Sequence, residues 1–267
     1  MRTTTYTFNP ETVVRDCIQW IQDWFEKNGK GCSAVIGMSG GKDSTIAAAL
    51  CARALGPENV IGVAMPDNGQ GVNKADEICK YLGINYLRMP ISGITGGFSR
   101  MWTELADEDF KWSMQAEQNI PPRIRMTLLY AVAQTYNGRV IETCNFSENY
   151  IGYFTLFGDG AGSMSPLGGL TVTEILQIGD YMGLPHKWVH KVPDDGLPHS
   201  CSDEEKIGFS YKELDKFIRE GIEPEGSCTN SSNTLKIDKI KKMNSDSDFK
   251  RSIVRIPFFE PRIWSVS

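Results

Sequence analysis

The sequence lacks the features that mark secreted, membrane or zinc-stapled proteins. Its cysteines number seven, and no two of them lie at C-x-x-C spacing, so neither a disulfide framework nor a structural zinc site is expected. No apolar stretch reaches the length of a membrane helix, and the N-terminal MRTTTYTFNP lacks the apolar core of a signal peptide. We therefore expect a cytoplasmic protein whose cysteines are mostly small buried side chains.

Positive charge and histidine are also scarce. A net charge of −5 argues against a general nucleic-acid binder, and the basic stretch Lys236–Lys242 is better interpreted as a solvated face. Of three histidines, His186 and His190 are four residues apart, which would suit a metal on one helix face, but we do not favour that interpretation. His199 lies near Cys201, yet no orienting partner indicates a nucleophile pair.

The chain does contain an alternation of strands and helices. Strands are expected at Val35–Met38, Val60–Met65 and Val140–Thr143, and the second of these has the continuous apolar character of a buried parallel strand. Helical patterns separate these strands, which predicts a doubly wound, mostly parallel α/β sheet with helices on both faces, in a single domain over residues 1–267. Helices are expected at Pro10–Lys27, Ser44–Leu55, Lys74–Leu82, Arg123–Tyr136, Thr171–Met182 and Tyr211–Ile218, a fourth strand at Asn85–Arg88, and a long loop at Asn145–Pro166.

The stretch Val35–Ser44, VIGMSGGKDS, carries the clearest chemical signal. A strand enters a turn with two glycines, and an alanine-rich helix follows. Gly40 and Gly41 can adopt backbone angles closed to other residues, so their N–H groups can face an anion at the helix N-terminus. A carboxylate at Asp43 beside phosphates requires a cation between them, and Mg²⁺ would serve. The alternative is a glycine-rich turn that only joins strand to helix.

This loop is not a Walker A sequence, because Ile36 stands where the first glycine is needed and Asp43 where a serine or threonine is needed. It resembles instead the pyrophosphate-binding loop of the PP-loop ATP pyrophosphatases, which cleave ATP between the α and β phosphates. Four further stretches sharpen the match: PPRIRMTLLYAVAQ, ETCNFSENYIGYFTLFGDG, SPLGGLTVTE, and KVPDDGL with SDEEKIGFSYKELD. Together they resemble the ammonia-dependent NAD synthetases from about residue 10 to about residue 260.

The resemblance implies a reaction and a set of residues. ATP would adenylate the carboxylate of deamido-NAD and release pyrophosphate, and ammonia would then displace AMP. Asp43 and Lys42 would be catalytic, Asp43 and Glu148 would hold Mg²⁺, and Arg123, Asp159 and Lys250 would bind the dinucleotide. The ATP contacts implied are Gly37, Ser39, Gly40, Gly41, Lys42, Asp43, Ser44, Met65, Thr143 and Lys191. Arg125 could be a substrate contact or a salt-bridging helix residue, and Glu148 could be a solvated glutamate at a helix start.

Several positions depart from the pattern of this family. Lysines expected near phosphates are Leu156 and Val172, and a substrate-binding aspartate is Ser163. The other two departures are Asp194, where a threonine is expected, and Phe249, where a histidine is expected. We expect basic residues from elsewhere to fill in, and the candidates are Lys187, Lys191, Lys250 and Arg251. Adenylation is therefore better supported than the identity of the acceptor.

The leading hypothesis is an ammonia-dependent NAD synthetase that uses ATP and Mg²⁺, acts as a homodimer and binds neither nucleic acid nor membrane. Free ammonia is expected as the nitrogen donor, because the PP-loop domain accounts for nearly all 267 residues and leaves no room for a glutaminase. Two alternatives stay open. One is a PP-loop enzyme that adenylates another carboxylate or an RNA base, and the other is a catalytically silent nucleotide sensor.

Overall fold

The computed structural model describes residues 4–67, 72–105, 113–190, 203–221, 232–253 and 255–266. Its strands are β1 (Thr4–Tyr6), β2 (Ser33–Gly37), β3 (Val60–Ala64), β4 (Asn85–Arg88), β5 (Gly138–Ile141) and β6 (Trp264–Val266). Its helices are α1 (Pro10–Asn28), α2 (Lys42–Leu55), α3 (Val72–Leu82), α4 (Ser92–Leu105), α5 (Met114–Thr135), α6 (Phe146–Ile151), α7 (Val172–Tyr181), α8 (His186–Val189), α9 (Asp203–Ile207), α10 (Tyr211–Glu220), α11 (Ser232–Asp246) and α12 (Asp248–Ile253). None of these helices is long and apolar enough to cross a membrane.

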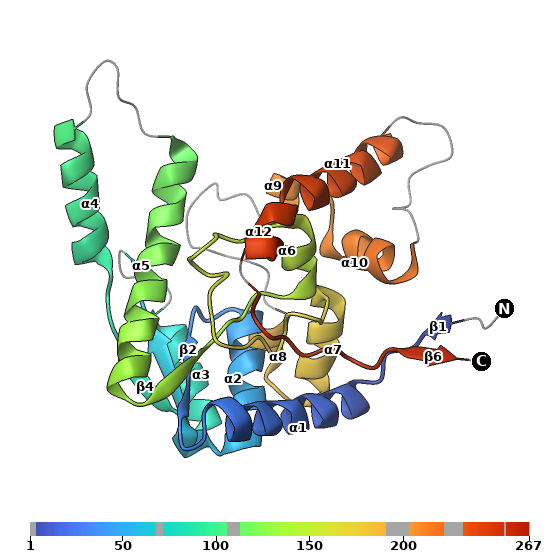
Figure 1. Ribbon diagram of the computed structural model, residues 1–267, viewed down its shortest axis with the longest axis horizontal. Helices are drawn as coiled ribbons and strands as arrows, with labels where there is room; N and C mark the ends of the chain where they lie inside the picture. The colour runs from blue at the N-terminus through green and yellow to red at the C-terminus, as the bar shows by residue number, and fades with distance from the viewer. Residues whose placement is uncertain are drawn as a thin grey trace.

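A four-stranded parallel sheet in the order β4-β3-β2-β5 forms the centre of the fold (Figure 1). Ala34 of β2 pairs with Val60 of β3 on one side and with Arg139 of β5 on the other. All three strand pairs are parallel, so their carboxyl ends lie at the same edge of the sheet. The expected doubly wound parallel sheet is confirmed.

Alternate residues of the strands face two different apolar clusters. Ala34 and Ile36 of β2 pack in a cluster with α1, α2, α3 and α7, whereas Val35 packs in a second cluster with α5. Helices therefore cover both faces of the sheet, and the strands are apolar on both sides, which explains their continuous apolar runs in the sequence. The sheet fixes the start of α2 and the end of β5 at one edge.

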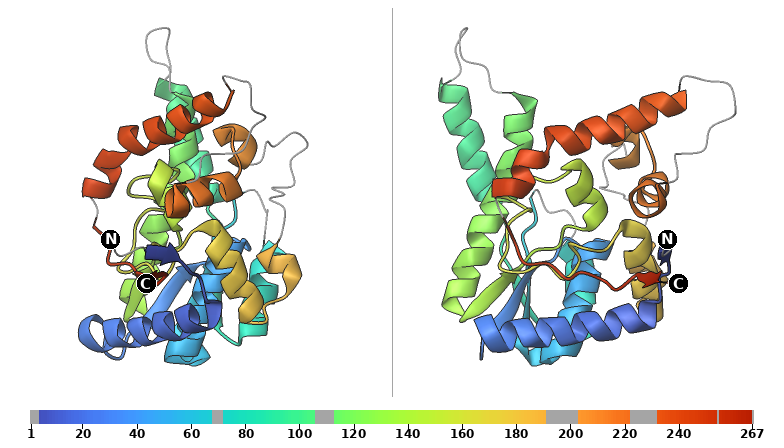
Figure 2. Two further views of the ribbon diagram at one scale, coloured as in Figure 1. Left: turned by 90° about the vertical axis from the view of Figure 1, so that its right-hand side faces the viewer. Right: turned by 45° about the vertical axis from the view of Figure 1, so that its right-hand side comes forward.

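A third apolar cluster lies outside the sheet. It joins α6, α7, α9, α10 and α11 through side chains that include Ile151, Leu214 and Ile240. The first and last strands of the chain, β1 and β6, pair antiparallel beside this part of the molecule (Figures 1 and 2). This terminal ribbon was not expected from the sequence, because it pairs two three-residue strands from opposite ends of the chain.

Two expected boundaries are wrong. The stretch Asn145–Pro166 is not entirely loop, because α6 occupies Phe146–Ile151 at its start. Helix α5 begins at Met114, not at Arg123, and it includes Pro121 and Pro122. Ser113 caps this earlier start by accepting a hydrogen bond from the backbone N–H of Ala116.

Candidate active site

The glycine-rich loop joins β2 to α2 as the sequence predicts. Gly40 has φ 78°, a left-handed conformation that favours glycine, and Gly41 precedes the first residue of α2. Helix α2 begins without a side-chain cap, unlike α1, α6, α7 and α10, so the loop leaves its first-turn N–H groups for another acceptor. The Ser39 hydroxyl lies 3.1 Å from that of Ser44 at this helix start.

Two carboxylates from different elements flank the loop. Asp43 lies in the first turn of α2, and Glu148 lies in the first turn of α6, which follows β5. Asn145 connects them: its side-chain amide donates to Asp43 Oδ1 at 3.2 Å, and its backbone N–H donates to Glu148 Oε2 at 3.1 Å. Burial, and then the negative charge of Asp43, raises the pKa of Glu148 to about 8.

Lys42 partly neutralises this acidic pair. Its Nζ lies 2.9 Å from Asp43 Oδ2. Although burial disfavours its charge, the carboxylates of Asp43 and Glu148 raise the pKa of Lys42, so the side chain stays a cation. Across the described residues, no three acidic, histidine or cysteine side chains are grouped as a ready metal centre. The pair offers two carboxyl groups against one ammonium, so a further cation is needed to balance the charge when both carboxyls are ionised.

A cavity of about 530 Å³ opens at the carboxyl edge of the sheet, next to this pair. Five carboxylates line it: Asp43, Asp67, Glu148, Asp159 and Asp203. Among the described residues that line the cavity, Arg125 is the only lysine or arginine. Apolar walls come from Val63, Met65, Met126, Leu129 and Ile141. A polyanionic ligand in this cavity would therefore need cations beyond the single arginine.

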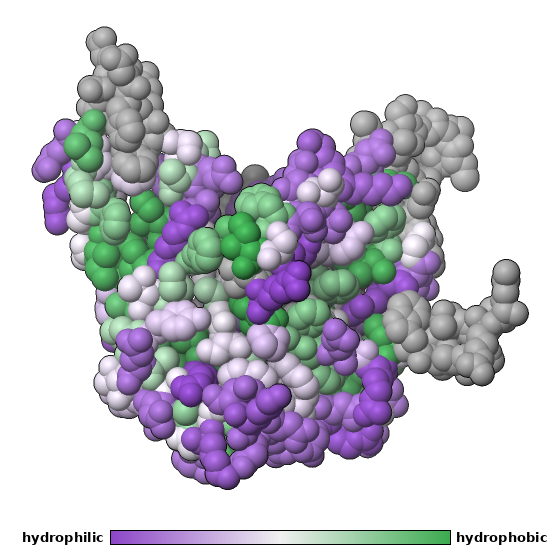
Figure 3. Space-filling model, viewed as in Figure 1, coloured by the Kyte–Doolittle hydropathy of each residue, from purple (hydrophilic) through white to green (hydrophobic). Residues whose placement is uncertain are grey.

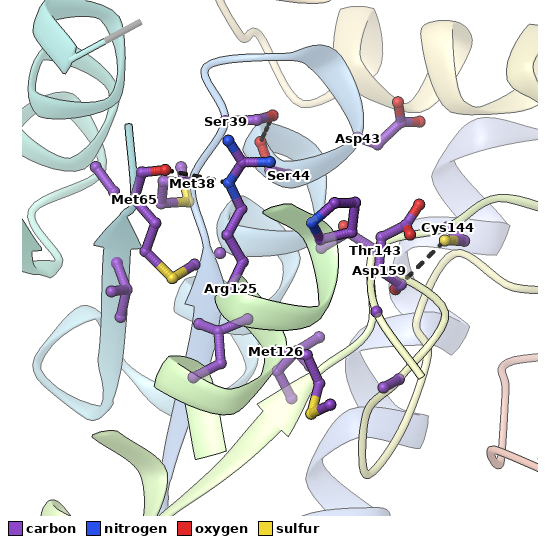
Figure 4. Close-up of a pocket in the computed structure, with 18 of the residues that line it drawn as sticks. Met38, Ser39, Asp43, Ser44, Met65, Arg125, Met126, Thr143, Cys144 and Asp159 are labelled. Atoms are coloured by element: carbon purple, nitrogen blue, oxygen red, sulfur yellow. Dashed lines mark hydrogen bonds between the residues drawn. The ribbon is translucent and has the colours of Figure 1, made fainter. Parts of the chain in front are cut away.

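Arg125 extends from α5 toward the loop that carries Ser39 and Ser44 (Figure 4). Its Nε donates to the backbone carbonyl of Met65 at 3.1 Å, which fixes the side chain against the end of β3. Burial lowers the pKa of the Arg125 guanidinium, and the charges of Asp67 and Asp159 oppose that shift. The sequence left this residue open between substrate contact and salt bridge, and its place in the cavity favours the first.

The structure brings most of the implied ATP and metal residues together. Gly37, Ser39, Asp43, Ser44, Met65, Thr143 and Glu148 all line the cavity, and Gly40, Gly41 and Lys42 complete the loop beside it. Of the residues implied to bind the dinucleotide, Asp159 lines the same cavity. Glu148 stands at a helix start, as the alternative interpretation held, but it lines the cavity, where the charge of Asp43 influences its carboxyl. Lys191 lies outside the described residues, as does the departure at Asp194.

Two residues implied to bind the substrate, Arg123 and Lys250, instead form hydrogen bonds with backbone carbonyls. Arg123 does not line the cavity, and its Nε donates to the backbone carbonyl of Leu156 at 3.3 Å. The Lys250 ammonium donates to the carbonyls of Gly152 and Phe154, each at 2.8 Å. Both side chains therefore hold the loop that follows α6.

The other basic candidates are also engaged. Lys187 pairs with Glu77 in an exposed salt bridge, and Arg251 donates to carbonyls of α6 at Asn149 and Tyr150. Of the departures, Val172 is buried in the third apolar cluster, whereas Phe249 is 53% exposed. His186 and His190 stack on each other with ring centroids 4.5 Å apart, and His190 also contacts Asp180.

Sequence reasoning missed several residues of the site. Asn145 had no assigned role, although an asparagine three residues before a glutamate is the pattern of a capping box, which α6 contains. Cys144 and Tyr153 also line the cavity; both lie in the stretch ETCNFSENYIGYFTLFGDG but had no assigned role, and Asp67 lies outside all of the quoted stretches. Tyr153 donates to Asp203 at 2.9 Å across the cavity wall. These contacts join segments far apart in the chain.

Comparison with known proteins decides the family. A model of the NAD synthase family matches residues 13–254. The chain belongs to the NAD synthase family. The NH(3)-dependent NAD(+) synthetase of Archaeoglobus fulgidus is 39% identical over 215 residues, which cover 79% of this chain and 84% of that protein. That of Carboxydothermus hydrogenoformans is 33% identical over 253 residues, which cover 93% of this chain and 98% of that protein.

Solved structures of NAD synthase relatives have the same fold. The NMN synthetase of Francisella tularensis superposes with a TM-score of 0.77 at 28% identity, over 94% of this chain and all of that one. The NH3-dependent NAD synthetase of Campylobacter jejuni superposes with a TM-score of 0.71 at 27% identity, over 93% of this chain and 99% of that one. The likeness extends over both the sheet and the helices that follow it.

Proposed function

We infer that this protein is an ammonia-dependent NAD synthetase. It uses ATP to activate the nicotinate carboxylate of deamido-NAD as an acyl-adenylate, releases pyrophosphate, and transfers ammonia to form the amide. The observation that carries this inference is the juxtaposition of Asp43 and Glu148 at the uncapped start of α2, in a chain that matches the NAD synthase family over residues 13–254. We further propose that it acts in the cytoplasm.

The loop is suited to hold the β and γ phosphates of ATP. The N–H groups at the start of α2 point out of the helix end, where its dipole favours negative charge. The hydroxyls of Ser39 and Ser44 add two donors at the same place, and the Lys42 ammonium lies beside them. These groups stabilise the pyrophosphate as negative charge builds on the leaving group.

The donor set fits Mg²⁺. This ion is commonly held by one or two protein carboxylates together with substrate phosphates and water, and Asp43 and Glu148, which Asn145 links, supply two such carboxyl groups. A bound Mg²⁺ would neutralise phosphate charge and so favour departure of pyrophosphate. Asn145 orients both carboxylates before any ligand binds, because its backbone contacts one and its side chain the other.

Arg125 is proposed to bind the phosphate at which the carboxylate reacts. A guanidinium pairs with phosphate oxygens in a fixed, two-pronged geometry, and the apolar wall beside Arg125 strengthens that pairing by excluding water. After adenylation, neutral ammonia attacks the acyl carbon and must lose a proton. Asp159 and Asp203 line the cavity and are candidates to accept it.

One assay tests the proposal. Purified protein is incubated with ATP, Mg²⁺, ammonium chloride and deamido-NAD, and NAD, AMP and pyrophosphate are measured. Equal formation of all three is expected, and ammonia-free glutamine should not replace ammonium. ATP–pyrophosphate exchange without NAD formation would keep adenylation as the activity but reject deamido-NAD as the acceptor. No exchange with any acceptor would support a nucleotide sensor instead.

A second acceptor belongs in the same assay. The structural likeness to an NMN synthetase, together with the cavity's single arginine, favours a test of nicotinate mononucleotide, which carries one phosphate instead of two. The ratio of kcat/KM for the two acceptors decides between them. A preference for the dinucleotide keeps the leading proposal, and a preference for the mononucleotide replaces it.

We also propose a homodimer. Helix α4 contains no buried residue, and Ile94, Phe98, Met101 and Leu105 are each at least 38% exposed on it. Apolar side chains gather over α4 and α5 on the face shown in Figure 3, as expected for a surface that a second copy covers. Sedimentation should give about twice the chain mass of 29.8 kDa. A species of single-chain mass at micromolar concentration would reject the dimer.

A further inference from the structure

Helix α10 contacts three different parts of the site from one face. Tyr211, Asp215 and Arg219 are spaced four residues apart, so they lie one above another along the helix. Each of them contacts a different segment. Tyr211 contacts Lys42 at the start of α2, Asp215 bonds to Ser147 of α6, and Arg219 bonds to Glu174 of α7. The three segments are far apart in the sequence, and helix α10 connects them in space.

Asp215 contacts Ser147, the residue that precedes Glu148. Its carboxylate is 4% exposed and accepts hydrogen bonds from the Ser147 hydroxyl at 2.5 Å, the Thr173 hydroxyl at 2.6 Å and the Thr173 N–H at 2.7 Å. Ser147 is fully buried, and its hydroxyl also accepts from the N–H of Val172. A single buried carboxylate thus joins α10, α7 and α6 at the residue that precedes Glu148.

Position and rotation of α6 decide where Glu148 points. This helix has six residues, so it cannot be stable by itself and takes its orientation from its contacts. Its capping box fixes Asn145 to Glu148 within the helix, and one hydrogen bond, from the Asn145 side chain to Asp43, links the helix start to α2. The bond between Ser147 and Asp215 supplies an external anchor for that turn. At the N-terminal end of α10, the Tyr211 ring lies 5.8 Å from the Lys42 ammonium.

We propose that α10 positions the metal-binding carboxylates, and that Asp215, acting through Ser147, holds Glu148 toward Asp43. Asp215 is a positioning residue, because its carboxylate is fully engaged by Ser147 and Thr173 and does not line the cavity. The inference rests on the proposed function only in the assignment of Asp43 and Glu148 to Mg²⁺. It does not depend on which carboxylate accepts the adenylate.

The test is the affinity of the full-length chain for ATP, measured by titration calorimetry with Mg²⁺ and again with EDTA. Asp215→Asn and Ser147→Ala should each weaken ATP binding by about tenfold in Mg²⁺ and leave binding in EDTA nearly unchanged. Ser147→Ala is the second variant because it removes the same bond from the other side and spares the bonds between Asp215 and Thr173.

Two controls separate positioning from loss of stability. Leu214→Val alters the fully buried neighbour of Asp215 and should lower the melting temperature with no change in the Kd for Mg·ATP. Lys216→Ala alters an exposed residue of the same helix and should change neither. In a Glu148→Gln background, Asp215→Asn should cause no further loss of Mg·ATP affinity, because the residue that it positions is already disabled.

The outcomes are distinct. Wild-type Mg·ATP affinity in both folded variants would overturn the inference, and so would a tenfold loss that persists in the Glu148→Gln background. A wild-type chain that binds ATP equally with Mg²⁺ and with EDTA would overturn both the inference and the metal assignment. A wild-type chain that binds Mg·ATP but makes no NAD would refute the proposed function alone.

Discussion

The glycine-rich loop between β2 and α2 and the loop at residues 152–162 border the same cavity, but the charged side chains at the two loops have different partners. At the first, the charged groups of Asp43, Lys42 and Glu148 contact or influence one another. At the second, the cations Arg123 and Lys250 donate to backbone carbonyls of the loop itself. Charge at the first loop is available for a ligand, whereas charge at the second stabilises the fold.

This difference shows why one half of the site is easier to assign than the other. A helix start without a side-chain cap, next to two partly buried carboxyl groups of which one has a strongly raised pKa, is typical of a site that binds an anion together with a cation. A cation that is bonded to two carbonyls already has a structural role. The acceptor side therefore has to be tested with variants that separate substrate contact from loop stability.

The largest expected effect comes from the acidic pair. Asp43→Asn and Glu148→Gln should each lower kcat/KM by at least about a hundredfold, or about 2–3 kcal/mol of transition-state stabilisation, with the fold intact. The measurement is steady-state NAD formation at saturating Mg²⁺, with circular dichroism to verify folding. Glu142→Gln is the matched control, because Glu142 is a buried glutamate six residues before Glu148 that does not line the cavity. Near wild-type turnover in both site variants would reject the metal assignment.

The next largest effect distinguishes the roles of Arg123 and Arg125, two arginines of α5. Arg125→Gln should raise the KM for ATP or for the acceptor by about thirtyfold, since a charge-assisted hydrogen bond contributes about 2 kcal/mol. Arg123→Gln, two residues away and outside the cavity, should change either KM by less than about threefold, in line with the loss of one exposed contact. A larger effect at Arg123 would favour the substrate role that the family resemblance implies and would contradict the phosphate-binding role proposed for Arg125.

The features of the fold and the site that the sequence predicted are those formed by contiguous residues. The strand at Val35, the SGGKDS loop and the helix after it are contiguous, so their geometry was predictable from apolar runs and glycine positions. The parallel sheet was also predictable, because strands buried on both faces are apolar throughout. The placement of Asp43 and Glu148 together required the rule that parallel strands end at one edge, together with the family resemblance.

What could not be predicted depends on contacts between distant segments. Pro121 and Pro122 indicated a helix start, yet α5 includes them. The residues four positions earlier, Glu117 and Gln118, are exposed, so water can bond the carbonyls that the prolines leave without a donor. The hydrogen bonds between Lys250 and Gly152 and between Ser147 and Asp215 join residues far apart in the chain, and no spacing in the sequence indicates either contact.

A smaller effect is expected from pH. Burial and the charge of Asp43 raise the pKa of Glu148 to about 8 in the metal-free chain, from the ordinary value of 4.5. Mg²⁺ binds the ionised carboxylate, so the Mg²⁺-dependent part of ATP affinity should rise about tenfold from about pH 7 to about pH 9. Calorimetry across this range tests it, and the rise should disappear in Glu148→Gln. A flat profile in the wild type would show that Glu148 does not bind the metal.

The effect of pH on folding stability has the opposite sign to its effect on ATP affinity. Between pH 4.5 and about 8 the metal-free folded chain keeps the Glu148 proton, which the unfolded chain has released. The contribution of this group to the free energy of unfolding is therefore fully present in acid and is lost as pH rises through about 8. Urea denaturation of the metal-free wild type and of Glu148→Gln should show a difference that changes with pH in this direction.

The smallest expected effect concerns Lys250, and it decides how the acceptor side works. Its ammonium joins the carbonyls of Gly152 and Phe154 and lies 4.9 Å from the Phe154 ring centroid, so the side chain holds the chain just after α6. Burial lowers the pKa of Lys250, and the negative charge of Asp159 opposes that shift. Its neighbour Arg251 holds carbonyls of α6 in the same way. The two residues together fix the end of the helix that carries Glu148.

Lys250→Ala should therefore lower the free energy of unfolding by about 1 kcal/mol, a value kept small because the side chain is only partly buried. The KM for the acceptor should change by less than about threefold, and Lys250→Arg should restore most of the stability because arginine can also donate to both carbonyls. Urea denaturation and steady-state kinetics measure the two quantities separately. If Lys250→Ala raised the KM for the acceptor at least about tenfold with stability unchanged, the ammonium would contact substrate directly, and both loops would then use their charges in the same way.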